Sequence, residues 1–103
     1  MIEDNIYHKK IIGTGHKHFV LIHNAGGNHH MFTYQIDCLL KYGNVILLDL
    51  PGNGKSQARK NHTINDSSQL IHDVCQHYNL QDIYIIGLNN GGSIAINTAH
   101  KYN

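Results

Sequence analysis

The segment with the most evident capacity for chemistry spans residues 87–92 and reads GLNNGG. A β-branched apolar run leads into it, and a run that can be helical leads out of it. A sharp turn between a strand and a helix, with glycines around the central residue, is the setting of the G-x-S-x-G nucleophile elbow. In that motif the central serine attacks a carbonyl carbon. Here the central residue is Asn89, whose amide has no proton that a histidine base could remove to make an alkoxide.

Two further segments could belong to the same site. Residues 23–27 read HNAGG and residues 49–56 read DLPGNGKS, and each directly follows an apolar run of strand length. The carboxyl ends of parallel strands meet at one edge of an open α/β sheet, where such sheets build their sites. We therefore expect all three segments to lie together at that edge.

Three apolar runs position these segments, over residues 19–22, 45–48 and 83–86. Continuous runs of this length are typical of strands that are buried on both faces of a parallel sheet. The less regular stretch over residues 5–12 ends at a Gly-Thr-Gly turn and predicts an edge strand. The sequence thus predicts four strands.

Helical patterns alternate with these strands. One imperfect amphipathic helix is predicted over about residues 30–40, with Met31 and Tyr34 in the core. A second begins near Thr63, where Asp66 occupies the position at which a capping box usually has Glu or Gln. The last covers about residues 90–102. This alternation indicates parallel β-α-β units, and hence one α/β domain over residues 1–103 with mostly parallel strands and flanking helices.

Composition excludes several classes of partner. The net charge is +1 over 103 residues, so charge gives no argument for binding nucleic acid or a membrane surface. The ten histidines are scattered, and we expect a more positive surface below about pH 6.5. Cys38 and Cys75 fall inside helical patterns and are expected to be reduced core residues. Neither an apolar leader nor a run of membrane-spanning length occurs, which favours a cytoplasmic protein.

Two alternative sites are weaker. Residues 52–56 read GNGKS like the end of a Walker A loop, but Asp49 stands where that motif needs glycine. Residues 49–52 are similar to a GTPase D-x-x-G, but no phosphate loop precedes them. A metal site needs three or four convergent ligands, and no cysteine or carboxylate accompanies the histidine pairs at residues 16 and 18 or 29 and 30 at ligand spacing. We expect no metal and no cofactor.

In order and spacing, the three segments resemble the α/β-hydrolase family, in the branch whose first loop reads H-G-x-G and whose second reads D-x-P-G-x-G-x-S. The resemblance covers essentially the whole chain but only the N-terminal part of a family domain. It implies the N-terminal half of an α/β-hydrolase sheet. It also implies hydrolysis of an ester, amide or similar carbonyl compound through an acyl-enzyme.

The resemblance also assigns roles to single residues. The backbone N–H groups of Ala25 and Asn90 would form the oxyanion hole, and Asn89 would occupy the nucleophile position. Asn24 stands where the family commonly has glycine, and asparagine is the next most tolerant residue for a positive φ. The residues expected to shape the loops are His23, Asn24, Gly26, Gly27, Asp49, Pro51, Gly52, Gly87, Gly91 and Gly92.

The departures from the family pattern predict a truncated and inactive chain. The family's acid and histidine follow the elbow, and no residue here matches either. Ser93 is expected to lie on the helix and point away, so it does not replace the nucleophile. Two alternatives stay open: one half of a split hydrolase, or a non-catalytic binding or assembly module. Expected partners are a small ester or amide ligand, and a second copy or complementing chain at the unpaired side of the strand over 83–88.

Overall fold

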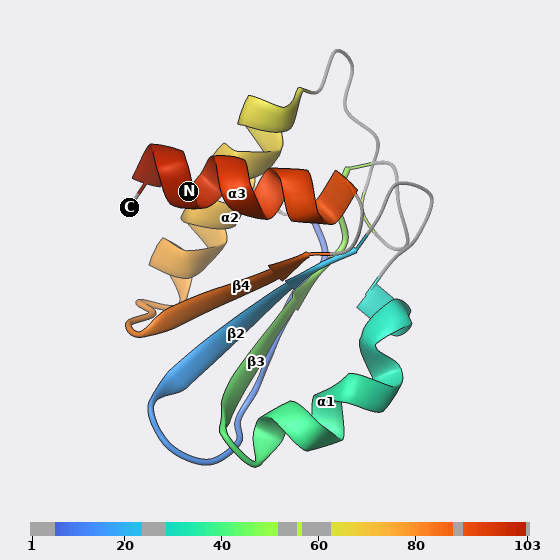
Figure 1. Ribbon diagram of the computed structural model, residues 1–103, viewed down its shortest axis with the longest axis vertical. Coiled ribbons are helices and arrows are strands. Elements are labelled where there is room, and N and C mark those ends of the chain that lie inside the picture. The colour runs from blue at the N-terminus through green and yellow to red at the C-terminus, as the bar shows by residue number, and fades with distance from the viewer. Residues whose placement is uncertain (1–5, 24–28, 52–55, 57–62, 88–89, 103) are drawn as a thin grey trace.

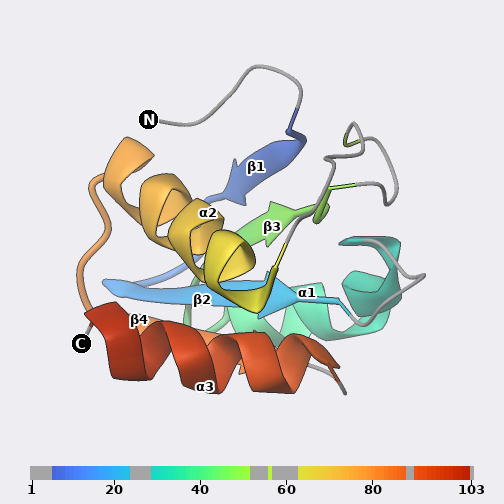
Figure 2. The same cartoon turned by 90° about the horizontal axis from the view of Figure 1, so that it is seen from above.

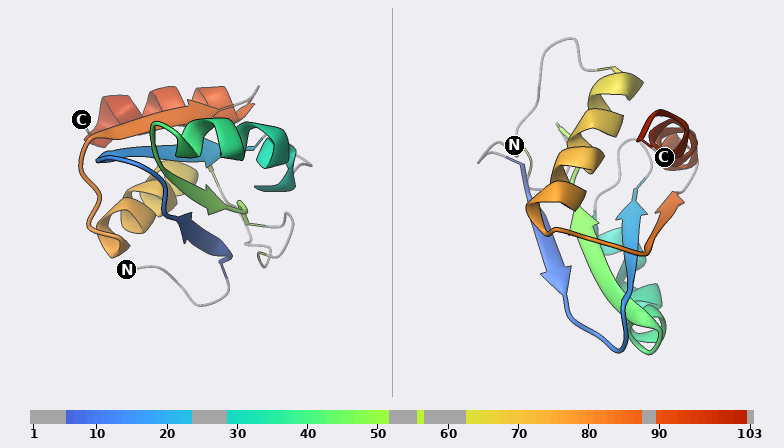
Figure 3. Two further views of the ribbon diagram at one scale, coloured as in Figure 1. Left: turned by 90° about the horizontal axis from the view of Figure 1, so that it is seen from below. Right: turned by 90° about the vertical axis from the view of Figure 1, so that its left-hand side faces the viewer.

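A four-stranded sheet forms the centre of the computed structural model, which describes residues 6–23, 29–51, 56, 63–87 and 90–102 (Figure 1). The strand order is β1-β3-β2-β4. The strands are β1 (His8–Ile11), β2 (Lys17–Ile22), β3 (Gly43–Leu48) and β4 (Ile83–Gly87). β1 runs antiparallel to β3, while β2, β3 and β4 are parallel, as the directions of the arrows show in Figure 3. The predicted α/β class with mostly parallel strands is confirmed.

The register places the ends of the parallel strands level with one another. Phe19 pairs with Val45 on β3 and with Tyr84 on β4, and Ile22 pairs with Gly87. β4 lies beside β2, and β3 lies on the other side of β2. The segments after β2, β3 and β4 therefore start from the same edge of the sheet, which we call the carboxyl edge.

Helices cover both faces of the sheet. A 3₁₀ turn, η1 (His29–Phe32), leads into α1 (Thr33–Leu40) on one face, and α2 (Ile64–His77) and α3 (Asn90–Tyr102) lie side by side on the other (Figures 1 and 2). Alternation along the strands supplies two apolar layers. The layer beneath α2 and α3 contains Val20, Ile22, Ile46, Leu48, Leu70, Ile71, Val74 and Ile94. The layer beneath α1 contains Leu21, Phe32, Val45 and Leu47.

The start of α2 follows its capping signal. The Thr63 hydroxyl accepts a hydrogen bond from the backbone N–H of Asp66 at 3.2 Å, and the Asp66 carboxylate accepts one from the N–H of Thr63 at 2.9 Å. Aspartate thus completes the box in place of the usual Glu or Gln. The pair satisfies two backbone donors that would otherwise be left at the helix terminus.

Polar side chains join α2 to α3. The Asn97 side-chain amide donates to Ser68 Oγ at 2.7 Å, and the Tyr102 hydroxyl donates to Gln69 Oε1 at 2.6 Å. The ring of Tyr102 also stacks on His72, with ring centroids 4.1 Å apart. These contacts hold the second half of α3 against α2.

Burial of β4 is where the strand prediction is wrong. β3 is fully buried, but Ile83, Tyr84 and Ile86 are 40%, 44% and 37% exposed. β4 is the outermost strand of the described sheet, so neighbours cover it on one side only. An apolar run predicts a strand that favours burial, and it carries no information about the strand's position in the sheet.

Two side-chain predictions for the helices, those for Tyr34 and Cys38, also need correction. Tyr34 is not in the core but 92% exposed, because Ile36 and Leu39 take the face of α1 that turns to the sheet. Cys38 is free but exposed, whereas Cys75 is free and half-buried. The side chain of Met31 lies outside the described residues. Of residues 52–62, the structure describes only Ser56.

Among the described residues, no helix is both long and apolar enough to cross a membrane.

Candidate functional site

The turn from β4 to α3 is built on close backbone packing at two glycines. β4 ends at Gly87 and α3 begins at Asn90, so the chain passes from strand to helix through residues 88 and 89, which lie outside the described part. A Cβ atom on Gly87 would overlap the carbonyl group of Gly91. One on Gly91 would overlap the carbonyl oxygen of Ile22 and lie 2.7 Å from that of His23. Neither position has room for a side chain.

Gly92 differs from its two neighbours in this turn. A Cβ there would lie 3.6 Å from the carbonyl oxygen of Gly87, which is an ordinary van der Waals separation. The tight approach is therefore specific to Gly87 and Gly91. It brings the first turn of α3 directly against the end of β2, and it has the strand–turn–helix order that a nucleophile elbow needs.

His23 links the end of β2 to the segment after β3. Its imidazole is fully buried, and its Nε2 accepts a hydrogen bond from the backbone N–H of Leu50 at 2.9 Å. Accepting at Nε2 places the ring proton of a neutral histidine on Nδ1. This is the geometry of a residue that positions a loop, which is the role suggested by the resemblance.

Asp49 and Ser56 tie the segment after β3 to the chain before β1. Asp49 is fully buried, and its backbone N–H donates to the carbonyl of Tyr7 at 3.1 Å. The Ser56 hydroxyl donates to the carbonyl of Asp49 at 2.5 Å and accepts from the N–H of Tyr7 at 2.9 Å. One hydroxyl thus satisfies two backbone groups far apart in sequence.

Sequence reasoning did not single out Ser56 as a site residue. It appeared only as the last residue of the D-x-P-G-x-G-x-S segment and of the GNGKS stretch compared with a Walker A loop. A hydroxyl at a fixed distance after a buried aspartate was the available signal, because such side chains commonly satisfy the backbone of a neighbouring turn.

The structure brings together part of the predicted site. His23, Asp49 and Gly87 follow or end the parallel strands at the carboxyl edge, with Pro51 just beyond Asp49. Asn90 is the first residue of α3, and its side chain lies outside the described part. The remaining predicted site residues lie outside the described residues: Asn24, Ala25, Gly26, Gly27, Gly52 and Asn89.

The helix start at Asn90 has an electrostatic consequence. The first backbone N–H groups of a helix have no partner within the helix, and the helix dipole concentrates positive potential there. A negative charge is therefore favoured close to the start of α3.

Three of the described titratable groups have clearly shifted pKa values: Cys75 on α2, Tyr78 at the end of α2, and His8 on β1, which pairs with Leu48 at the end of β3. Burial raises the pKa of the Cys75 thiol to about 11, which keeps it protonated at neutral pH. Burial, and then the neighbouring charge of His77, lower the pKa of His8. A 2.7 Å hydrogen bond joins Nδ1 of His8 to the hydroxyl of Tyr78, whose pKa is raised by burial and by Tyr7. This cluster connects β1 to the end of α2.

Metal ligation finds no support in the part of the chain that the structure describes. There, no group of three or more histidine, cysteine, aspartate or glutamate side chains converges on a common point. The strand-start histidine His18 instead places its Nδ1 2.6 Å from the carbonyl oxygen of Gln81, a hydrogen bond that links β2 to the approach to β4.

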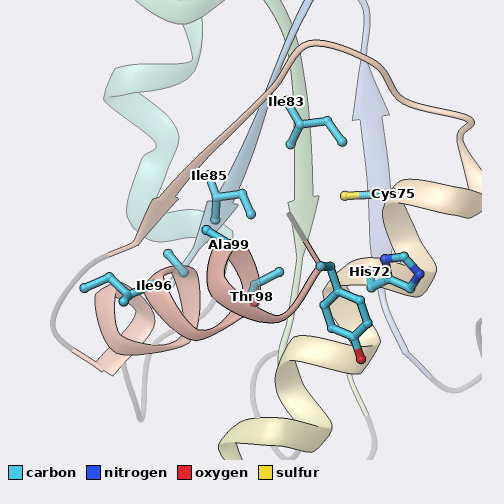
Figure 4. Close-up of a pocket in the computed structure, with 9 residues that line it drawn as sticks. His72, Cys75, Ile83, Ile85, Ile96, Thr98 and Ala99 are labelled. Carbon is cyan, nitrogen blue, oxygen red and sulfur yellow. The ribbon is translucent and has the colours of Figure 1, made fainter.

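An open groove of about 480 Å³ lies between α2, α3 and β4 (Figure 4). Its wall is mainly apolar and includes Ile83, Ile85 and Ile96, with His72 and Cys75 on the α2 side. The groove follows the first part of β4 and the second half of α3, so it lies away from Gly87 and the carboxyl edge. We do not assign chemistry to it, because its titratable groups are a thiol kept protonated and a histidine stacked on Tyr102.

Comparison with protein families gives one match that spans most of the chain. A family described as "alpha/beta hydrolase fold" matches residues 17–103. The chain is also 34% identical over 82 residues to the magnesium-chelatase 30 kDa subunit of Rhodobacter capsulatus, which covers 78% of this chain and 29% of that protein.

Solved structures of similar shape include two esterases. The esterase of Exiguobacterium antarcticum matches with a TM-score of 0.86 at 29% identity. The match covers 95% of this chain and 37% of the esterase chain. A carboxylesterase structure from Nitrososphaera gargenis has a TM-score of 0.88 at 28% identity, over 99% of this chain and 40% of its own. The chain therefore spans about two fifths of the length of these structures.

Proposed function

The chain belongs to the alpha/beta hydrolase fold family, and on that premise we propose that residues 1–103 form the substrate-activating part of a carbonyl-ester or amide hydrolase site that lacks its nucleophile. The observation that carries the proposal is the packing of Gly91 against the end of β2. This packing brings the start of α3 against the end of β2, the point from which the segment after His23 begins. These are the two segments from which the family draws its oxyanion donors.

Oxyanion stabilisation is the chemistry we assign to this arrangement. The backbone N–H groups of Ala25 and Asn90 would donate to the carbonyl oxygen of an ester or amide as it gains negative charge. Donors that are already in place at a helix start need no reorganisation during the reaction, and losing one costs about 3–4 kcal/mol. His23 and Ser56 would hold the flanking segments in position through their backbone hydrogen bonds.

Asn89 removes the covalent step from this site. A serine there would add to the carbonyl carbon after giving its proton to histidine, whereas an amide cannot form that alkoxide. Within residues 1–103, no aspartate or histidine matches the acid and base positions of the family. We therefore propose that these 103 residues by themselves do not form an acyl-enzyme.

The first test measures hydrolysis of 4-nitrophenyl acetate by the unmodified chain and by Asn89→Ser. We expect neither to exceed the buffer rate significantly, because serine without a histidine base stays protonated. Mass spectrometry after treatment with a fluorophosphonate, which labels activated serines, should detect no adduct on either. Substantial turnover by the unmodified chain would disprove its proposed inactivity.

The second test supplies the acid and the histidine of the family from another protein, so that only the residue at position 89 differs between the two samples. Residues 1–103 would be joined to the part of the Exiguobacterium antarcticum esterase that follows the matched region. The fusion carrying Asn89→Ser should hydrolyse the ester and take up the fluorophosphonate, while the Asn89 fusion should do neither. Ser93→Ala in the active fusion is the matched control, because Ser93 is exposed on α3 and should be dispensable. Equal activity of both fusions would show that residue 89 is not the nucleophile position.

A non-catalytic role in assembly is the second candidate. It is favoured by the exposed apolar side chains of β4, Ile83, Tyr84 and Ile86. Either another copy of the chain or a complementing polypeptide could cover them. A complementing polypeptide that supplied an acid and a histidine would make this chain one part of a split hydrolase.

A further inference from the structure

One peptide group, directly after β3, is bound by a side chain at each of its two ends. The carbonyl of Asp49 and the N–H of Leu50 belong to this same group, because the peptide bond joins these two residues. The Ser56 hydroxyl donates to the carbonyl at 2.5 Å, and His23 Nε2 accepts from the N–H at 2.9 Å. The peptide bond is trans and planar, so its carbonyl and N–H point in opposite directions. Ser56 and His23 therefore bind opposite ends of one rigid plane.

The hydrogen bonds around this peptide group all run in one direction. The backbone N–H of Tyr7 donates to Ser56 Oγ at 2.9 Å, and the Ser56 hydroxyl donates to the carbonyl of Asp49. The same peptide group then donates through the N–H of Leu50 to His23. Each acceptor group is thus also the next donor. Hydrogen bonds in such a series polarise one another, so a hydroxyl bound at the carbonyl makes the N–H of that peptide group a stronger donor.

Burial makes this series sensitive to the loss of one member. His23 and Asp49 are fully buried, and Leu50 and Ser56 are nearly so. A buried carbonyl that loses a hydrogen-bond donor is costly, and the backbone lowers that cost by turning toward another donor. Because the peptide group is rigid, a rotation of its carbonyl also rotates its N–H away from His23. Loss of the Ser56 hydroxyl is therefore transmitted to the imidazole.

His23 lies where this series reaches the carboxyl edge. It directly follows β2, and its backbone carbonyl oxygen would lie 2.7 Å from a Cβ on Gly91. The segment to which the proposed function assigns one of the two oxyanion donors begins after this residue. A displacement of His23 is thus a displacement at the start of that segment.

We propose, on the basis of the proposed function, that Ser56 is a positioning residue for ester hydrolysis. It acts on the carboxyl edge through the Asp49–Leu50 peptide group and the imidazole of His23. This role goes beyond anchoring the chain before β1, because a hydroxyl that only joined Tyr7 to the end of β3 could be removed without an effect on His23. Ser56 itself takes no part in breaking or forming a bond.

The first experiment observes His23 directly, by nuclear magnetic resonance of the isotopically labelled chain of residues 1–103. We expect a scalar coupling across the hydrogen bond between the backbone nitrogen of Leu50 and Nε2 of His23, with the ring proton on Nδ1 alone. Ser56→Ala should weaken the coupling by about half or more and give a mixture of the two imidazole tautomers. Ser93→Ala is the matched control, because Ser93 is exposed on α3 and should leave both signals unchanged.

Two further variants keep this experiment decisive. If Ser56→Ala does not fold by far-UV circular dichroism, Ser56→Cys takes its place, because a thiol donates only weakly and should also reduce the coupling. Ser56→Thr keeps a hydroxyl and should retain the coupling. Absence of the coupling between Leu50 and His23 in the unmodified chain would overturn the proposal, and so would a coupling that is indifferent to the Ser56 hydroxyl.

The second experiment measures the catalytic consequence in the fusion with the Exiguobacterium antarcticum esterase segment that carries Asn89→Ser. Ser56→Ala should lower kcat for 4-nitrophenyl acetate about tenfold and change KM by less than about twofold, because a displaced oxyanion donor affects the transition state more than the bound substrate. Ser56→Thr should recover most of the loss. In a His23→Leu background, Ser56→Ala should cause little further loss, because residues that act through one contact are not additive.

The outcomes separate this proposal from the proposed function. Equal losses from Ser56→Ala with and without His23→Leu would overturn the proposal, because Ser56 would then act by a route that does not include His23. A raised KM with unchanged kcat would also overturn it. A fusion with Asn89→Ser that hydrolyses no ester would contradict the proposed function instead, and the coupling between Leu50 and His23 would still decide whether Ser56 positions the imidazole.

Discussion

The two outer edges of the sheet are held by different means. The β1 edge is held by polar contacts. The Ser56 hydroxyl forms hydrogen bonds with the backbones of Tyr7 and Asp49, and His8 forms one with Tyr78 at the end of α2. At the β4 edge, the close contact is between backbones: Gly91, at the start of α3, packs against the end of β2. The β1 edge is charged and linked by side chains, while the β4 edge is apolar and open. The difference shows that a strand can be fixed in register without being protected from a partner.

The largest expected loss of stability is at the contact between Gly91 and the end of β2. Gly91→Ala would force a Cβ against the carbonyl groups of Ile22 and His23, and backbone cannot move aside as a flexible side chain can. We expect a loss of about 3 kcal/mol in the free energy of unfolding, measured by urea denaturation. A loss below the uncertainty of that measurement would show that α3 can shift away from β2, and the comparison between the edges would fail.

The next effect is at the polar edge. Ser56→Ala leaves the N–H of Tyr7 and the carbonyl of Asp49 without their shared partner. Leaving such buried groups unsatisfied should lower the free energy of unfolding by about 2 kcal/mol. Ser93→Ala is the matched control, because Ser93 is exposed on α3 and its loss should be within experimental error. Equal effects of the two exchanges would mean that Ser56 does not anchor the β1 edge.

The free energy of unfolding should depend on pH through His8 at the β1 edge. Burial and the charge of His77 lower the pKa of His8 in the folded state. Below the ordinary histidine pKa, near 6.5, the unfolded chain therefore binds more protons than the folded chain does. Stability is then fully present above about pH 6.5 and falls as the pH drops through the lowered pKa of the folded state. His8→Gln should flatten this part of the stability profile, measured by thermal unfolding between pH 5 and 8. An unchanged profile in His8→Gln would place the pH dependence elsewhere.

The smallest effect sharpens the first prediction. A Cβ on Gly92 meets only ordinary contacts, and alanine favours the helix more than glycine does. Gly92→Ala should therefore raise the free energy of unfolding by up to about 1 kcal/mol, with the same urea assay. A loss comparable to that of Gly91→Ala would mean that the whole turn, rather than one contact, excludes side chains.

The sequence predicted the strands, their mostly parallel direction and the change from strand to helix between Gly87 and Asn90, because apolar runs and glycine positions depend on local chemistry. It did not predict the exposure of β4, because burial of an outer strand depends on what lies beyond it. Tyr34 was misplaced for a geometric reason: it lies two residues before Ile36 within α1, and residues two apart do not share a face of a helix. The contacts of Ser56 with Tyr7 and Asp49 join distant segments and leave no periodic signal.

The central place of β2 bears on the order in which the chain folds. β2 can pair with β3 after a short intervening helix, but its other neighbour arrives much later, since His18 pairs with Ile83 across most of the chain. Closing long loops before contacts form slows folding. During synthesis, β2 and β3 can therefore pair before β4 has been made, which leaves one side of β2 unpaired. A nascent chain in that state exposes the apolar side chains of the central strand, and this interval is when capture by a chaperone would be most effective.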